Sequence, residues 1–176
     1  FMAGDNLLDV GCAYGCALDA LKVDFRRRCG VDLSPQAIAA VKRKGYEGHC
    51  GDIFSAPWRN ETFDLVLCFD TIEHVYDPVP FLEKVAALLR PRGVAARATP
   101  NLDSWLSRLS GKRWVSLKIP EHVLYFTPSS MERLLELSGF SAECFRRDVQ
   151  CSPLALVLDR LGETVPGLGG VCHALA

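Results

Sequence analysis

The stretch Leu8-Asp9-Val10-Gly11-Cys12-Ala13-Tyr14-Gly15 (LDVGCAYG) decides the fold. It joins an apolar run at residues 6–10, which predicts a buried strand, to a helical pattern over residues 15–24. The small residues at positions 11, 13 and 15 let a ligand approach the backbone closely. The spacing G-x-A-x-G differs from the G-x-G-x-x-G of dinucleotide-binding loops, whose last glycine would fall at position 16, where this sequence has Cys16. Asp9 suits a ligand with an ammonium group better than one with a diphosphate.

Beyond this loop, short apolar runs alternate with amphipathic segments. Ser34 and Asp77 are the predicted N-caps of two helices that begin with proline, at Pro35 and Pro78. This alternation predicts an α/β fold: a doubly wound, mostly parallel seven-stranded sheet with helices on both faces, in one domain over residues 1–176. The segment 100–126 is too long for a simple turn and forms either a substrate lid or a second hydrophobic layer packed on the sheet. Within it, Leu102, Trp105, Leu106 and Leu109 have the i, i+3, i+4, i+7 spacing of a short amphipathic helix. After the first, the expected strands are residues 28–32, 47–50, 63–69, 94–99 and 141–147 and a last strand at 170–176, and a further helix starts at Pro128.

The composition excludes several classes of function. The chain has 176 residues and a formal net charge of −1, so neither a nucleic-acid partner nor a membrane partner is expected. No apolar run approaches the ~20 residues of a membrane helix, and no signal-peptide pattern is present. The eight cysteines are scattered, and Cys50 and Cys68 lie in apolar runs, which favours buried thiols in a cytoplasmic protein.

These segments resemble the class I S-adenosylmethionine-dependent methyltransferases. LDVGCAYG resembles their first motif, D-x-G-x-G-x-G, with Ala13 in place of the middle glycine, a change that we expect to be tolerated at negative φ. VDLSPQAI, GDI and FDLVLCFDTIEHV resemble the next three motifs. LLRPRGV resembles a turn that usually reads L-x-P-G-G, and Arg92 departs from that pattern. The resemblance covers most of the chain. The segment 118–128 is similar to bacterial methyltransferases of the ubiquinone-pathway O-methyltransferase type, and this similarity favours a lid at residues 100–126.

The resemblance implies S-adenosylmethionine as cofactor and assigns a role to each position. The loop would form the floor under the methionine part, Asp9 would lie near the amino group, and Asp32 would accept the ribose hydroxyls. Asp52 would accept the adenine amine, while Leu33 and Ile53 would cover the ring. The implied cofactor-binding residues are Asp9, Gly11, Cys12, Ala13, Gly15, Asp32, Leu33, Asp52, Ile53 and Phe69.

The stretch FDTIEHVYDP at residues 69–78 carries the candidate catalytic groups. Asp70, Glu73 and His74 have the i, i+3, i+4 spacing of one helical face, and His122 follows the next predicted strand. Three interpretations remain open: His74 or His122 is a general base, the four residues bind a divalent cation, or they only cap helices. The two related branches with such a cation site, ubiquinone-pathway O-methyltransferases and small-RNA 3′-end methyltransferases, usually carry Glu where Asp70 stands. The base is therefore favoured.

The sequence thus predicts an enzyme that methylates a small-molecule acceptor at oxygen. A cofactor-binding module without turnover, an RNA methyltransferase and a nicotinamide-dependent dehydrogenase are the alternatives. Family members generally carry a helix ahead of the first strand, and the given sequence starts only a few residues before it. Either that helix precedes this sequence or the substrate site is open.

Overall fold

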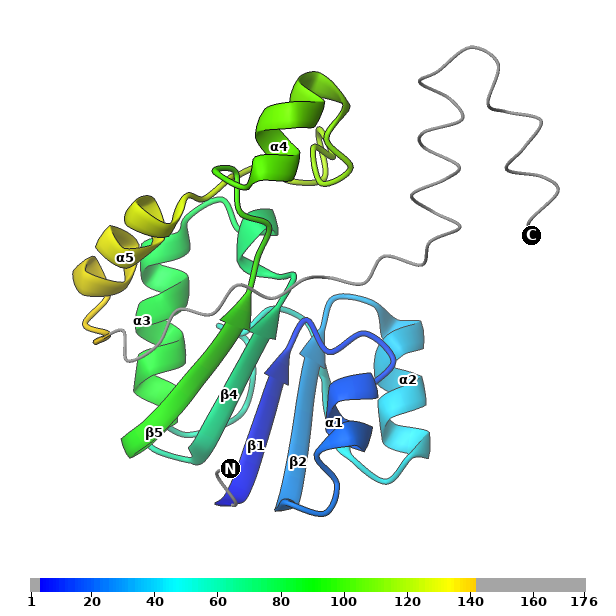
Figure 1. Cartoon of the computed structure of the whole chain (residues 1–176). Helices are drawn as coiled ribbons and strands as arrows, with labels where there is room; N and C mark the ends of the chain where they lie inside the picture. The colour runs from blue at the N-terminus through cyan, green and yellow to red at the C-terminus, as the bar shows by residue number, and fades with distance from the viewer. Residues whose placement is uncertain (1–3, 142–176) are drawn as a thin grey trace, which may run out of the picture. The chain divides into compact units, whose positions relative to one another are not determined.

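The computed structural model describes residues 4–141, which lie within one compact unit, Phe1–Glu143. Their centre is a parallel sheet of five strands in the order β3-β2-β1-β4-β5. Figure 1 labels four of them, β2, β1, β4 and β5, side by side. From β1 the strands are added first on one side, as β2 and β3, and then on the other side, as β4 and β5. Open α/β sheets bind ligands at such a change in strand order, here between β1 and β4. The strands are β1 (Gly4–Val10), β2 (Phe25–Asp32), β3 (Glu47–Cys50), β4 (Phe63–Phe69) and β5 (Leu89–Ala98).

Helices cover both faces of the sheet (Figure 1). Strand β1 divides its side chains between two cores, because successive residues point to opposite faces. Leu7 packs with the residues under α1 and α2, and Leu8 packs with those under α3 and α5. The helices are α1 (Cys16–Ala20), α2 (Pro35–Arg43), η1 (Ile72–His74), α3 (Pro78–Leu88), α4 (Trp105–Ser110), η2 (Gly111–Arg113) and α5 (Pro128–Leu137).

Most of the expected elements are present, with changes at their ends. The Ser34 side chain accepts a hydrogen bond from the N–H of Ala37 as predicted, whereas Asp77 occupies the N-cap of α3 without a side-chain cap bond. The first helix ends at Ala20 instead of residue 24. Strand β5 begins at Leu89 and includes the expected turn, where Arg92 has a φ of 68°. The predicted strands at 141–147 and 170–176 lie outside the described residues, so five of the seven strands are found.

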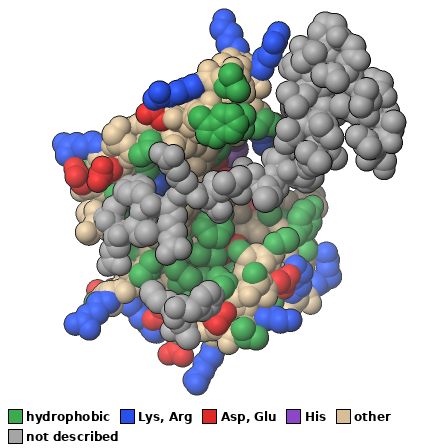
Figure 2. Space-filling model, viewed as in Figure 1, with side chains coloured by type: hydrophobic (Ala, Val, Ile, Leu, Met, Phe, Trp, Pro, Cys, Tyr) green, Lys and Arg blue, Asp and Glu red, His purple; other side chains and the backbone are tan. Residues whose placement is uncertain are grey.

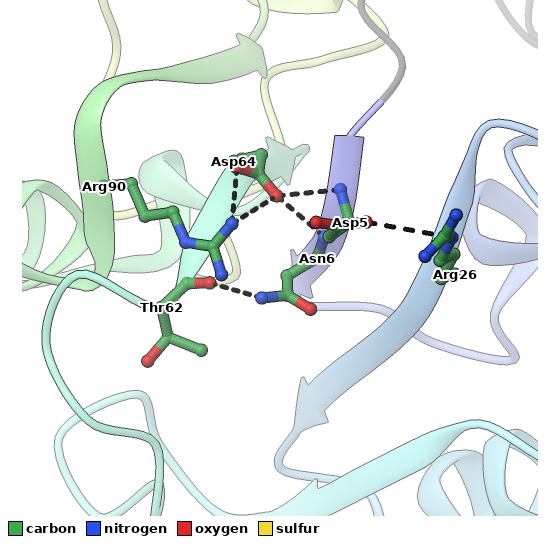
Figure 3. Close-up of polar contacts among 6 residues, drawn as sticks. All are labelled: Asp5, Asn6, Arg26, Thr62, Asp64 and Arg90. Atoms are coloured by element: carbon green, nitrogen blue, oxygen red, sulfur yellow. Dashed lines mark hydrogen bonds and ion pairs between the residues drawn. The ribbon is translucent and has the colours of Figure 1, made fainter.

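A polar network joins the starts of the strands, at the edge opposite the glycine loop (Figure 3). Asp64 Oδ2 accepts hydrogen bonds from the N–H groups of Asp5 (3.0 Å) and Asn6 (2.8 Å), and Arg90 donates to Asp64 Oδ1 at 3.0 Å. The Asn6 amide donates to the Thr62 carbonyl at 2.7 Å. A polar hollow of about 630 Å³ beside it is lined by Asp5, Lys22 and Arg26 among others. These contacts hold β1, β4 and β5 in register.

The segment between β5 and α5 forms a separate projection above the sheet (Figure 1). The i, i+3, i+4, i+7 spacing predicted a short helix here, and α4 is found; it exposes 74% of Trp105 and 77% of Leu109 and buries Ser107. Apolar and basic side chains stand out together at this end of the molecule (Figure 2). No helix within residues 4–141 combines the length and apolarity that crossing a bilayer requires.

Candidate active site

The glycine loop follows β1 and bends through three left-handed residues. Gly11, Ala13 and Gly15 have φ angles of 73°, 43° and 78°. Ala13 therefore does not meet the condition of a negative φ under which its methyl group was expected to be tolerated, and it adopts a conformation that usually costs a non-glycine residue about 1–3 kcal/mol. The Val31 carbonyl accepts hydrogen bonds from the N–H groups of Gly11 (2.9 Å) and Cys12 (3.2 Å). The loop is thereby held against the end of β2.

Asp32 closes β2 and organises the neighbouring backbone. Its Oδ2 accepts a hydrogen bond from the Ala13 N–H and its Oδ1 accepts one from the Ser34 N–H, both at 2.8 Å. The carboxylate stabilises the strained loop in this way and compensates for the conformation of Ala13. A carboxylate has about four acceptor sites, so two more donors, such as a pair of ribose hydroxyls, can still bind.

Asp9 lies one residue before the end of β1 and is 4% exposed. Burial, with a smaller contribution from the negative charge of Asp32, raises the pKa of Asp9 from 3.8 to about 7. Burial is also the main cause that raises the pKa values of the Cys12 and Cys68 thiols to about 12. Two acids in this poorly solvated space favour a positively charged ligand.

Asp52 follows β3 and caps a tight turn. Its Oδ1 accepts a hydrogen bond from the Ser55 N–H at 2.7 Å, and this bond is the main reason why the pKa of Asp52 is lowered. Ile53, the residue expected to cover adenine, is 3% exposed and packs in the core that also holds Leu8. Its neighbour Phe54 is 55% exposed.

Large apolar side chains are exposed just after four successive strands. Tyr14, Leu33, Phe54 and Phe69 are 58%, 76%, 55% and 42% exposed and follow or end β1, β2, β3 and β4. Leu33 and Phe69 were predicted from the sequence, and Tyr14 and Phe54 were not. Together with Asp32 and Asp52 they give this edge both apolar and acidic character, as a nucleoside requires.

Thr71 is a further residue that sequence reasoning missed. Its hydroxyl lies 2.9 Å from both the Val10 carbonyl and the Phe69 carbonyl, so it joins the end of β1 to the turn after β4. A Cβ atom at position 11 would lie 2.6 Å from this hydroxyl. Gly11 is therefore required by close contact as well as by its φ angle.

Glu73, His74 and His122 converge beyond the end of β4, where one ligand atom from each lies within 4.8 Å of the others. Glu73 is 1% exposed and accepts a hydrogen bond from the Thr99 hydroxyl at 2.9 Å. Its Oε1 and the Nδ1 of His122 are buried without a hydrogen-bond partner, as is the Tyr125 hydroxyl. Buried polar atoms of this kind normally have partners, so Glu73 Oε1 and His122 Nδ1, from two residues that converge here, favour a polar ligand.

The backbone brings the two histidines together. The N–H groups of Val123 and Leu124 donate to the Glu73 carbonyl at 2.9 and 3.1 Å, which places the two imidazole rings edge to face at a centroid distance of 4.8 Å. His74 Nδ1 lies 2.7 Å from the Glu121 carbonyl. Because a carbonyl only accepts, Nδ1 carries the proton in the neutral ring, and the lone pair of that tautomer is on Nε2.

The expected common face of Asp70, Glu73 and His74 is not formed. Asp70 precedes η1, has a φ of 47° and is exposed, while Glu73 points into the core. Cys50, predicted to be buried, is exposed as well, whereas Cys68 is 2% exposed. One carboxylate and two imidazoles therefore remain as the candidate cation ligands, and this oxygen-and-nitrogen set fits a transition metal such as Zn²⁺ better than Mg²⁺.

Curated relatives of known name match most of this chain. A ubiquinone biosynthesis O-methyltransferase of Nitrobacter winogradskyi is 31% identical over 151 residues, which cover 78% of this chain and 57% of the relative. An enzyme of the same name from Aromatoleum aromaticum is 26% identical and is covered over 64% of its length. The chain thus spans less than two thirds of the length of these relatives.

Solved structures share the fold at low sequence identity. An S-adenosylmethionine-dependent methyltransferase of Methanosarcina mazei superposes with a TM-score of 0.71 at 18% identity, with 88% of each chain covered. One from Mesorhizobium loti gives a TM-score of 0.68 at 17% identity, covering 93% of this chain and 86% of that one. The family model described as "Methyltransferase domain" matches residues 2–144. The chain therefore belongs to the methyltransferase domain family and has the fold of the S-adenosylmethionine-dependent enzymes.

Proposed function

We propose that the chain binds S-adenosylmethionine at the edge formed by the ends of β1, β2 and β3 and transfers its methyl group to a small-molecule acceptor. One observation carries this proposal: acids at the ends of three adjacent strands surround a loop with two glycines at positive φ. Asp9 faces the ammonium and sulfonium charges, Asp32 binds the ribose hydroxyls and Asp52 binds the adenine amine. Tyr14, Leu33, Phe54 and Phe69 provide the apolar contacts.

The accepting atom is a hydroxyl oxygen, and His74 is the general base. The proton on Nδ1 is held by the Glu121 carbonyl, so Nε2 can take the proton of an acceptor hydroxyl. The bound cofactor supplies an activated methyl group on its sulfonium. The oxygen forms the new C–O bond as the S–CH₃ bond breaks, and S-adenosylhomocysteine leaves. Alignment of the two reactants contributes roughly 7–11 kcal/mol.

The exposed apolar residues of α4 provide a contact surface for the apolar part of the acceptor. Trp105 and Leu109 lie on the segment that also carries His122, with Leu106 between them at 42% exposure. The segment 100–126 acts as a lid that closes over an acceptor with an apolar body and a hydroxyl group. Such closure excludes water from the sulfonium.

A divalent cation bound by Glu73, His74 and His122 is the second candidate for this site. The buried Glu73 Oε1 and His122 Nδ1, both without partners, favour it. When bound, the cation would supply Lewis-acid activation of the acceptor hydroxyl. These side chains would hold it, and the Thr99 hydroxyl would fix the orientation of Glu73. Calorimetric titration of Zn²⁺ or Mn²⁺ into protein that was first treated with a chelator distinguishes the two roles. A stoichiometric heat of binding that Glu73→Gln abolishes supports the cation site, and the absence of binding heat supports the general base.

Calorimetry tests the cofactor site directly. We expect S-adenosylhomocysteine to bind and NAD not to bind, with Asp32→Asn lowering the affinity at least tenfold. Asp103→Asn is the matched control, because Asp103 is exposed and lies on the projection rather than at the cofactor edge. Equal affinity of the Asp32→Asn and Asp103→Asn proteins would contradict the site, provided that both have the far-UV circular dichroism of the parent.

Turnover is tested with labelled S-adenosylmethionine and panels of phenols, alcohols, amines and thiols. We expect labelled product from a hydroxyl compound and a loss of about 10²–10⁴-fold in His74→Gln. Cofactor binding without product from any panel would indicate a binding module. Product from structured RNA alone would indicate the RNA alternative.

A further inference from the structure

The turn at residues 51–55 is connected to β3 by one side chain, His49. His49 Nε2 lies 3.1 Å from the Ser55 hydroxyl. That hydroxyl is also 3.0 Å from the Asp52 carbonyl, and the Ser55 N–H bonds the Asp52 carboxylate at 2.7 Å. The side chain of Asp52 is thus two hydrogen bonds away from the imidazole ring.

The direction of these bonds follows from which of the atoms can donate a hydrogen. The Ser55 hydroxyl has one hydrogen, and the Asp52 carbonyl can only accept it. The Ser55 oxygen therefore accepts from His49, which places the proton of the neutral ring on Nε2. The chain of donors runs from the imidazole through the hydroxyl to the backbone of Asp52.

There is little free space around this connection. A Cβ atom at Gly51, where φ is 150°, would lie 2.8 Å from the Ser55 hydroxyl and 3.0 Å from His49 Nε2. The Gly51 N–H donates to the Asp32 carbonyl at 3.0 Å, so the turn is also fixed to the end of β2. The two acids that bracket the proposed nucleoside are joined through a few tightly packed atoms.

His49 also has a contact that does not involve the turn. Its ring meets Trp58 edge on at a centroid distance of 6.3 Å, and Trp58 belongs to the core. A purely structural histidine would act through this ring contact alone. Phenylalanine keeps the ring and removes the hydrogen bond, whereas glutamine keeps an N–H donor and removes the ring. The two roles can therefore be separated.

We propose that His49 is a positioning residue that orients the Asp52 carboxylate toward the adenine amine and so sets the selectivity for adenine. This inference rests on the proposed cofactor site. Without the bond from His49, the Ser55 hydroxyl keeps only its bond to the Asp52 carbonyl, so the turn is no longer tied to β3 and can shift, which misaligns the carboxylate. Contacts to the ribose and to the methionine part do not depend on this bond.

The experiment measures the affinities of S-adenosylhomocysteine and S-inosylhomocysteine, which has a 6-oxo group in place of the amine. We expect the parent protein to prefer the adenine ligand at least tenfold. His49→Phe should reduce that ratio roughly five- to tenfold, as loss of one hydrogen bond predicts, while the affinity for the inosine ligand changes less than twofold. His49→Gln should retain at least half of the ratio.

The outcomes separate this inference from the proposed function. Failure of the parent protein to bind S-adenosylhomocysteine would overturn the cofactor site itself. Normal binding with an unchanged ratio in His49→Phe would overturn only the role of His49. An equal loss of affinity for both ligands, together with a lower melting temperature, would identify a purely structural histidine and would also overturn it.

Discussion

The buried Asp9 predicts a specific dependence of stability on pH. A carboxyl group whose folded-state pKa is about 7, against an ordinary value of 3.8, binds a proton more strongly in the folded state. The free energy of unfolding therefore falls as pH rises from 3.8 to 7, and the group's stabilising effect is fully present only below that range. A span of about three pH units at 1.36 kcal/mol per unit corresponds to about 4 kcal/mol.

Replacement of Asp9 by asparagine removes this titration while preserving the size of the side chain. Between pH 5 and pH 8, we expect the parent protein to lose about 2–3 kcal/mol of unfolding free energy through Asp9, because two of those three units lie above pH 5. Asp9→Asn should not show this loss. Its stability relative to the parent should therefore rise by the same amount over that interval. Urea unfolding at the two pH values measures the difference.

Asp64→Asn is the matched control. Burial alone would raise the pKa of Asp64, but the Asn6 N–H and the Arg90 guanidinium lower it overall. Its stabilising effect is lost only as pH falls below 3.8, so this variant should be destabilised equally at pH 5 and pH 8. Parallel behaviour of Asp9→Asn and Asp64→Asn across this range would refute the reasoning.

The same group links ligand binding to proton release. S-adenosylmethionine carries a sulfonium charge, which favours the ionised form of Asp9. Near pH 6, we expect binding to release up to one proton, measured as a difference in calorimetric heat between two buffers of unequal ionisation enthalpy. Asp9→Asn should bind more weakly and abolish the difference. A buffer-independent heat in the parent protein would refute the link.

Three further predictions concern the backbone and the thiols. Gly11→Ala should lower the free energy of unfolding by about 1–3 kcal/mol or more. The new Cβ would lie 2.6 Å from the Thr71 hydroxyl, and the φ of 73° is unfavourable for alanine; an unchanged urea midpoint would contradict this prediction. Arg92→Gly should raise the free energy of unfolding by roughly 1 kcal/mol, because Arg92 has a φ of 68°, which glycine adopts more readily; a lower urea midpoint would contradict this prediction. Among the five described cysteines, iodoacetamide should label Cys16 and Cys50 first by peptide mass spectrometry, because Cys12, Cys29 and Cys68 are buried.

The sequence predicted the elements whose signals are local. Strands β3 and β4 have the expected ends, and Ser34 caps α2 as expected, since a polar cap, a proline and an apolar period all agree there. Local chemistry determines these features, so the sequence is sufficient for them.

The sequence did not predict features that depend on contacts between distant segments. The left-handed φ of Ala13 is stabilised by Asp32, which lies 19 residues away in the chain. The role of Thr99 depends on its contact with Glu73, and no spacing rule joins them. The apolar period of α4 was correct, but periodicity does not indicate whether an apolar face packs on the sheet or stays exposed for a ligand.

The strand order has a consequence for folding during synthesis. β1 pairs with β2 through the crossover that contains α1, whereas its other edge pairs only when β4 has been made, and the Asn6–Asp64 bond spans 58 residues. As the chain leaves the ribosome, β1, β2 and β3 can associate early, with one side of the central strand uncovered. We expect that stalled nascent chains ending before residue 63 associate with chaperones that bind exposed strand edges, and that chains extending past β5 are released from them.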